Sequence, residues 1–227
     1  MLDAEILLSS VLDVPKPWLF AHFTDHIKQH HEEKFLLLIN RRIKHEPVAY
    51  LTGVKEFYGR NFLVNPSVLI PRPATESMVT EALKIFAQCD PELTLLVDIG
   101  TGSGAIAITL AAQTHTSVLA TDIEQSALSI ANENAKKLGV TEWVEFQQGD
   151  LLEPIAKLFH TLHASKNTNV SSVYPFRDMI ICANLPYLTL SQIDQLNPDV
   201  RYEPISALRA GVDGLDAYFE LLTIEKK

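Results

Sequence analysis

A run of glycines between an apolar segment and a helical segment constrains the possible folds of this chain more than any other feature. Residues 95–99 read Leu-Leu-Val-Asp-Ile, residues 100–104 read Gly-Thr-Gly-Ser-Gly, and residues 105–112 follow with a helical pattern. Glycines at such a turn let a ligand approach the backbone beyond the carboxyl end of a strand. The run alone does not identify the ligand, because the same spacing occurs in nicotinamide enzymes and in ordinary tight turns.

Short apolar segments alternate with helical segments around this turn. The pattern predicts strands at 95–99, 117–122, 143–147 and 178–183, and helices at 105–112 and 125–138. Such alternation is typical of an α/β domain with a parallel sheet.

The chain before residue 91 has a different pattern. Helical periodicity predicts three helices, at 4–12, 24–43 and 75–88. Glycines and prolines separate three short β-like runs, at 48–51, 56–58 and 62–64. We therefore expect three parts: an N-terminal helical domain at 1–45, a hairpin connector with a linking helix at 46–90, and a ligand-binding domain at 91–227.

Three acidic residues close consecutive predicted strands. Asp122 follows Asp98 by about twenty residues, where a carboxylate can accept both hydroxyls of a ribose. Asp150 closes the third strand, the position expected for a residue beside an adenine ring. Each acid alone could cap a turn or a helix, but the three together favour a nucleoside ligand. The spacing leaves NAD open as an alternative.

The fourth predicted strand is followed directly by Asn184-Leu185-Pro186-Tyr187. An amide nitrogen is a poor nucleophile because its lone pair is delocalised, so an enzyme that alkylates one must orient it. An Asn side-chain oxygen and a neighbouring backbone carbonyl can accept both N–H bonds of such an amide. Proline fixes the backbone, and the tyrosine ring can stack on a planar amide or base. The motif therefore predicts chemistry at a planar nitrogen.

Composition and charge exclude several classes of protein. The 227-residue chain has a net charge of -9, which disfavours binding to a phosphate backbone as the main activity. No apolar run approaches the roughly 20 residues that span a bilayer, and the first residues carry acids where a signal peptide carries Lys or Arg. We expect a cytoplasmic protein without membrane contact. Cys89 and Cys182 lack a Cys-x-x-Cys spacing, so we expect free thiols and no metal.

Several motifs together resemble one family. The glycine run and Asn184–Tyr187 are similar to those of methyltransferases that use S-adenosylmethionine. The chain most resembles the HemK-type glutamine N5-methyltransferases, which modify peptide chain release factors. The segments that carry this resemblance are 42–53, 56–59, 69–76, 202–204 and 211–216. Ile70-Pro71-Arg72-Pro73 and Asp213-Gly214-Leu215-Asp216 are far more specific than the glycine run.

The resemblance implies a Rossmann-like class I methyltransferase sheet, with the N-terminal helical domain gripping the release factor. It also implies a monomer that binds no nucleic acid directly. The expected cofactor-binding residues are Asp98, Gly100, Thr101, Gly102, Ser103, Gly104, Asp122, Ile123, Asp150, Leu151 and Asn184. The expected catalytic and substrate-binding residues are Asn184, Leu185, Pro186 and Tyr187, with Pro71 and Arg72 near the mouth of the site.

Leu185 departs from the family pattern, which usually has proline there. A leucine also supplies a backbone carbonyl, so we expect the chemistry to survive with a less rigid loop. Asn-Leu-Pro-Tyr also resembles the motif of ribosomal RNA adenine N6-methyltransferases, which remains an alternative, as does a non-catalytic cofactor-binding protein. The N-terminal helical domain and the acidic charge argue against the RNA enzyme.

The resemblance implies seven strands, whereas four are legible. The apolar run at 178–183 suits an interior strand covered on both faces, yet in the usual strand order it becomes an exposed edge here. We therefore expect a C-terminally truncated enzyme. The polar stretch at 161–172 predicts a mobile surface loop.

Overall fold

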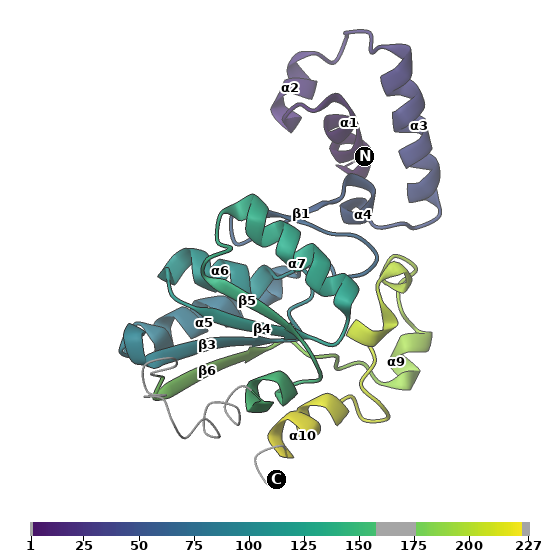
Figure 1. Ribbon diagram of the computed structural model, residues 1–227. Coiled ribbons are helices and arrows are strands. Elements are labelled where there is room, and N and C mark those ends of the chain that lie inside the picture. Colours follow the sequence, from purple (N-terminus) through teal and green to yellow (C-terminus); the bar gives the residue numbers. More distant parts are fainter. Residues whose placement is uncertain (1, 158–175, 224–227) are drawn as a thin grey trace.

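The computed structural model describes residues 2–157 and 176–223, and Figure 1 shows a group of helices set above a twisted sheet. The predicted loop at 161–172 lies outside the described residues. The N-terminal helices are α1 (Leu2–Leu12), α2 (Lys16–Ala21), α3 (Gln29–Ile43) and α4 (Val48–Thr52). α1 packs against α3 and α4, and its Leu7 is fully buried.

The first helix is confirmed, and three features of this region differ from the predictions. α3 begins at Gln29 rather than at residue 24. α2 is a helix that the sequence patterns did not predict, and its Pro17 lies in the first turn, where no backbone N–H is needed. The β-like run at 48–51 is wrong, since α4 forms there between Pro47 and the left-handed Gly53.

The predicted hairpin and linking helix are confirmed. β1 (Val54–Phe57) pairs antiparallel with β2 (Arg60–Leu63), and the turn between them has positive φ at Tyr58 and Gly59. Phe57 and Phe62 meet edge to face beneath the hairpin. A short 3-10 turn, η1 (Pro73–Thr75), leads into α5 (Glu76–Phe86), whose Val79, Ala82 and Phe86 are buried.

The predicted parallel sheet is confirmed in all four strands. In order along the chain, the elements are η2 (Pro91–Leu93), β3 (Thr94–Ile99), α6 (Ala105–Thr114), β4 (Val118–Asp122), α7 (Gln125–Leu138), β5 (Val144–Gln148) and β6 (Asp178–Ala183). The spatial order is β5-β4-β3-β6. β4 and β5 are added on one side of β3, and β6 then lies on the other side of β3, so the order of strand addition reverses between β3 and β6. Ligands of open α/β sheets bind at such a switch point, beyond the carboxyl ends of the strands.

The two faces of the sheet are covered unequally. One face packs against the hairpin, α5, α6 and α7 in the larger core. The other face packs against residues 151–155 and α10 (Asp216–Thr223) in a smaller core. β6 pairs only with β3 among the described strands, and on the second face its Met179 and Ile181 are 39% and 43% exposed. The strand order predicted β6 as an exposed edge strand, and among the described strands it is one, with these two side chains partly exposed.

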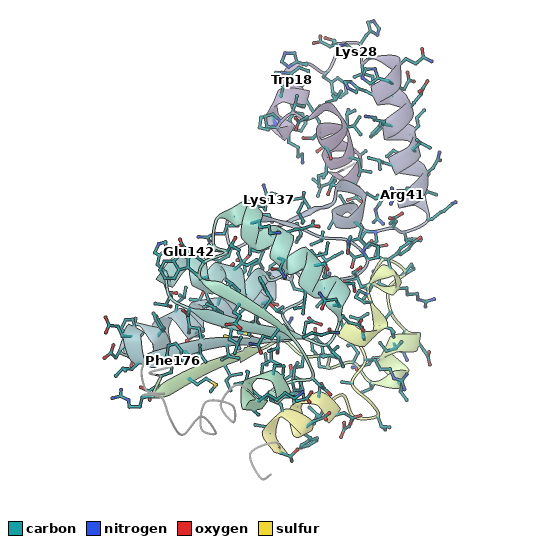
Figure 2. All side chains as sticks on the ribbon, in the orientation of Figure 1. Trp18, Lys28, Arg41, Lys137, Glu142 and Phe176 are labelled. Atoms are coloured by element: carbon teal, nitrogen blue, oxygen red, sulfur yellow. The ribbon has the colours of Figure 1, made fainter. Side chains whose placement is uncertain are left out.

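The sequence patterns predicted no helix or strand bounds after β6. The segment there forms α9 (Leu190–Asp194), the 3-10 turns η4 (Val200–Tyr202) and η5 (Ile205–Ala207), and then α10. η4 contacts the end of α3: Arg42 forms ion pairs with Asp3 at 2.7 Å and with Asp199 at 2.9 Å. Tyr202 also donates a 2.8 Å hydrogen bond to the carbonyl of Lys44. Figure 2 shows Arg41 at this near end of α3, with Trp18 and Lys28 at the far end of the helical group.

No helix among the described residues is long and apolar enough to cross a membrane. Residues 2–157 and 176–223 also contain no cluster of three or more acidic, His or Cys side chains placed to hold a metal.

Candidate active site

The glycine run forms a tight loop between β3 and α6. Gly100, Gly102 and Gly104 all have positive φ, at 69°, 55° and 81°. A Cβ added at Gly104 would lie 2.7 Å from the side chain of Ile108, and one at Gly100 would lie 3.3 Å from that of Leu185. Both the backbone conformation and the space therefore require glycine at position 104.

Asp98 is buried beneath this loop. Its Oδ2 accepts a 2.7 Å hydrogen bond from the Thr101 hydroxyl and a 3.1 Å bond from the Ala107 backbone N–H. Its Oδ1 has no hydrogen-bond partner within the described part of the chain. Burial raises the pKa of this carboxyl to about 7. Asp98, expected to bind the cofactor, holds the shape of the loop and does not line the cleft described below.

Asp122 at the end of β4 lies beside the loop. Its Oδ2 accepts a 2.8 Å hydrogen bond from Gly102 N–H, and its Oδ1 accepts a 3.0 Å bond from Glu124 N–H. Burial raises the pKa of Asp122 above its usual range, although these N–H groups oppose the shift. The carboxylate thus fixes the middle of the glycine loop and borders the cleft together with Ile123.

Asn134 of α7 also fixes the glycine loop, and sequence reasoning gave it no role. Its fully buried amide donates to the carbonyl of Ser103 at 2.9 Å and to that of Leu63 at 3.0 Å. Its oxygen accepts the N–H of Leu63 at 2.6 Å. One side chain therefore joins the free edge of the hairpin to the glycine loop. An isolated Asn in a helix carries no sequence signal of such a contact.

A cleft of about 390 Å³ opens over the carboxyl ends of β3, β4, β5 and β6. The sequence-predicted residues on its wall are Gly100, Thr101, Gly102, Ser103, Asp122, Ile123, Asp150, Leu151, Asn184, Leu185, Pro186 and Pro71. Asp150 is exposed at the rim, whereas Leu151 is buried with a positive φ of 44°. Gly104 does not line the cleft, in agreement with its packing against α6 and α7.

A second cleft of about 540 Å³ adjoins the first. Tyr187 and Arg72 line it, and the Tyr187 side chain is 60% exposed. Asn184 and Leu185 line both clefts, so they stand at the boundary between them. No hydrogen bond engages the Asn184 side chain among the described residues, which leaves its amide free to bind a ligand.

Glu203 joins the connector to the segment after β6. Its buried carboxylate accepts a 3.1 Å hydrogen bond from Ile70 N–H and forms a 2.5 Å ion pair with Arg72. The sequence predicts Arg72 as a substrate-binding residue, and the structure places it both in this pair and on the wall of the second cleft. Two of the family-like motifs, 69–76 and 202–204, are therefore the two sides of one contact.

The segment 211–218 packs against the Asn184–Tyr187 motif from the other side. Gly214 has a φ of 80°, and a Cβ there would lie 2.5 Å from the carbonyl oxygen of Tyr187. Tyr218 of α10 donates a 3.3 Å hydrogen bond to the carbonyl oxygen of Leu185. The sequence identified residues 211–216 of this segment as a motif but gave Tyr218 no role.

A strand-end cleft that joins a glycine loop, an acid at the end of the next strand and an Asn-x-Pro-Tyr motif has the features of a methyltransferase site. A family model for a methyltransferase domain matches residues 92–184, and a model for the PrmC N-terminal domain matches residues 1–53. The expected fold class is confirmed.

Curated relatives identify the family. The release factor glutamine methyltransferase of Moorella thermoacetica is 40% identical over 97% of this chain and 71% of its own length. That of Bacillus subtilis (strain 168) is 39% identical over 95% of this chain and 70% of its own length. A bifunctional methyltransferase of Rickettsia conorii is 33% identical over 96% of this chain and 43% of its own length. This chain belongs to the release factor glutamine methyltransferase family, as its motifs predicted.

Proposed function

We propose that this protein transfers a methyl group from S-adenosylmethionine to the side-chain amide nitrogen of the glutamine in the Gly-Gly-Gln loop of a peptide chain release factor. The observation that carries the proposal is the position of Asn184 and Leu185 on the boundary between two clefts. One cleft contains the glycine loop, and the other is open to a macromolecular substrate. A substrate amide at this boundary would donate its two N–H bonds to the motif and present its nitrogen to a methyl group in the first cleft.

The first cleft fits S-adenosylmethionine. Its volume of about 390 Å³ lies within the range of small-molecule sites. The glycine loop offers a wall without side chains, and Asp122 keeps lone pairs for a ribose diol beside its two backbone bonds. Ile123 and Leu151 supply apolar surface near Asp150, where a purine ring would lie. When bound, the cofactor supplies a methyl group on a cationic sulfonium, which is already activated for transfer.

The protein's part in the reaction is to orient the amide. The Asn184 side-chain oxygen and the Leu185 carbonyl would accept the two N–H bonds, so that the nitrogen lone pair faces the first cleft. Tyr187 borders the second cleft and would stack on the planar amide. The nitrogen becomes acidic once alkylated, so proton loss follows methyl transfer and needs no dedicated base.

The N-terminal helices would bind the body of the release factor. Apolar side chains lie exposed on them and on the turn after α2, including Phe20 at 63%, Phe23 at 84% and Leu37 at 65%. Such surface marks sites of protein contact when it is continuous. A substrate of this kind places the enzyme in the cytoplasm, where translation ends, and requires neither nucleic acid nor a second copy of the chain.

Mass spectrometry of release-factor peptides after incubation with the cofactor tests the proposal. We expect the mass gain of one methyl group on the Gly-Gly-Gln peptide. Asn184→Ala should lower the rate by about 100-fold or more, as loss of a preorganised polar group at a reacting centre does. Asn132→Ala is the matched control, because the Asn132 amide bonds only the carbonyl of Leu128 within α7. Labelled methyl on ribosomal RNA, with none on the release factor, would refute the proposal.

A further inference from the structure

Tyr218 is the one described residue whose side chain forms a hydrogen bond with the Asn184–Tyr187 motif. Its hydroxyl lies 3.3 Å from the carbonyl oxygen of Leu185. Burial raises the pKa of Tyr218, so the hydroxyl keeps its proton and acts as a donor throughout the neutral range. The bond is longer than the ~2.8 Å usual for hydroxyl donors, and hydrogen bonds at reacting centres commonly tighten when substrate is bound.

Leu185 needs such support. A proline ring at this position would fix φ, whereas leucine, although restricted by the following Pro186, leaves φ a wider range. The Leu185 side chain is 4% exposed and belongs to the smaller core, in which Tyr218 and Ala217 of α10 also pack. The side chain is therefore held by packing. The direction of the carbonyl depends on what bonds its oxygen.

We propose that Tyr218 is a positioning residue that fixes the Leu185 carbonyl in the direction of the acceptor amide. The inference rests on the proposed function, in which that carbonyl accepts one N–H of the amide. A carbonyl oxygen has two lone pairs, so the hydroxyl can occupy one and leave the other for the substrate. Gly214, two residues before α10, lies close to the Tyr187 carbonyl, so α10 begins beside the same loop.

Tyr218→Phe removes the hydroxyl and keeps the ring in its packing. We expect kcat for methyl transfer to the release factor to fall about fivefold, the effect of losing one neutral hydrogen bond. The dissociation constant of S-adenosylmethionine and the unfolding midpoint should stay unchanged, because the ring still fills its place. A merely structural role would change those two quantities instead.

Tyr58→Phe is the matched control. Tyr58 is also half-buried, and its hydroxyl makes a similarly long contact of 3.4 Å, with Thr80 on α5, away from both clefts. We expect wild-type kcat from this variant. Equal kcat in Tyr218→Phe and Tyr58→Phe would overturn the inference.

A second measurement reads the carbonyl itself, whether or not the release factor is methylated. Leu185-Pro186 is the only Leu-Pro pair in the sequence, so labelling leucine with 13C at the carbonyl and proline with 15N selects this one carbonyl in a carbon–nitrogen correlation spectrum. The Leu185 signal should shift in Tyr218→Phe and stay in place in Tyr58→Phe. An unmoved signal overturns the inference. If the wild-type enzyme does not methylate the release factor but the Leu185 signal shifts in Tyr218→Phe, the proposed function is refuted and the contact between Tyr218 and Leu185 is confirmed.

Discussion

At the end of β3, buried or half-buried polar side chains hold the glycine loop from three directions: Asp98 from below, Asp122 from β4 and Asn134 from α7. At the end of β6, one hydroxyl among residues 2–157 and 176–223 bonds the Asn184–Tyr187 motif, and Met179 and Ile181 of the strand are partly exposed. The cofactor half of the site, at residues 100–104, is therefore held in one shape. The acceptor half, at residues 184–187, follows an edge strand with partly exposed side chains. Regions with few buried contacts open more easily than core strands.

The largest effect should be a dependence of the unfolding free energy on pH, caused by Asp98 in the cofactor half of the site. The folded-state pKa of Asp98 is about 7, against an ordinary value of 3.8 in the unfolded chain. Between these values the folded state binds more protons, so the free energy of unfolding falls as pH rises, by roughly 4 kcal/mol in total. Asp98→Asn cannot titrate and should lose this slope. Urea unfolding of both proteins from pH 5 to pH 8 measures it, and parallel profiles would contradict the assignment.

Core truncation at neighbouring positions should give the next largest contrast. Leu95 of β3 and Met179 of β6 are paired in register, yet Leu95 is 2% exposed and Met179 is 39% exposed. Leu95→Ala should cost about 3 kcal/mol of unfolding free energy, and Met179→Ala about 1 kcal/mol, because the exposed side chain leaves a smaller cavity. Denaturant titrations compare the two. Equal losses would show that β6 is as well packed as β3.

Two glycines of the same loop separate space from backbone conformation. Gly104→Ala would meet Ile108 at 2.7 Å, whereas Gly102→Ala would meet no atom within 4 Å, and both positions have positive φ. Gly102→Ala should cost about 1 kcal/mol through strain alone, and Gly104→Ala about 2 kcal/mol more through overpacking. Thermal unfolding distinguishes them. If the two variants unfold alike, the contact of Gly104 with α6 has no energetic weight.

The smallest effect should come from the contact between the helical domain and the segment after β6. Arg42→Gln removes the ion pairs with Asp3 and Asp199, which are partly exposed, so the loss of unfolding free energy should stay below about 1 kcal/mol. Lys84→Gln is the control, since its pair with Glu81 lies on the exposed face of a single helix, α5. Chemical unfolding in low and high salt measures both. A loss of several kcal/mol for Arg42→Gln would contradict the prediction and show that these ion pairs stabilise the fold as buried ion pairs do.

The sequence predicted the elements around the glycine loop well, because strand length, apolar runs and helical periodicity are local properties. It also predicted that residues at the ends of these strands lie near one another, because parallel strands bring their carboxyl ends to one edge of the sheet. It failed where a local signal has two meanings. Proline can end a helix or stand in its first turn, as Pro17 does in α2, and the apolar run at 48–51, predicted to be extended, forms α4.

The supporting residues of the site could not be predicted, because each acts across a large sequence separation. Asn134 bonds Leu63, Glu203 bonds Ile70 and Tyr218 bonds Leu185, and no periodicity or spacing encodes these partners. Asp98 is a different case. Its place at a strand end predicts ligand contact, and the structure adds a role that the sequence did not indicate, because the buried carboxyl bonds the Thr101 hydroxyl beneath the loop.

The ion pair between Arg72 and Glu203 has a consequence for the order in which the site is completed during synthesis. Arg72 precedes Glu203 by 131 residues, whereas the side chains that hold the glycine loop have all been made once Asn134 has been added. A chain growing from its N-terminus can therefore assemble the support of the glycine loop while the side of the second cleft formed by residues 184–188 and 207–208 is still missing. The nascent enzyme acquires its cofactor loop early and its acceptor cleft late.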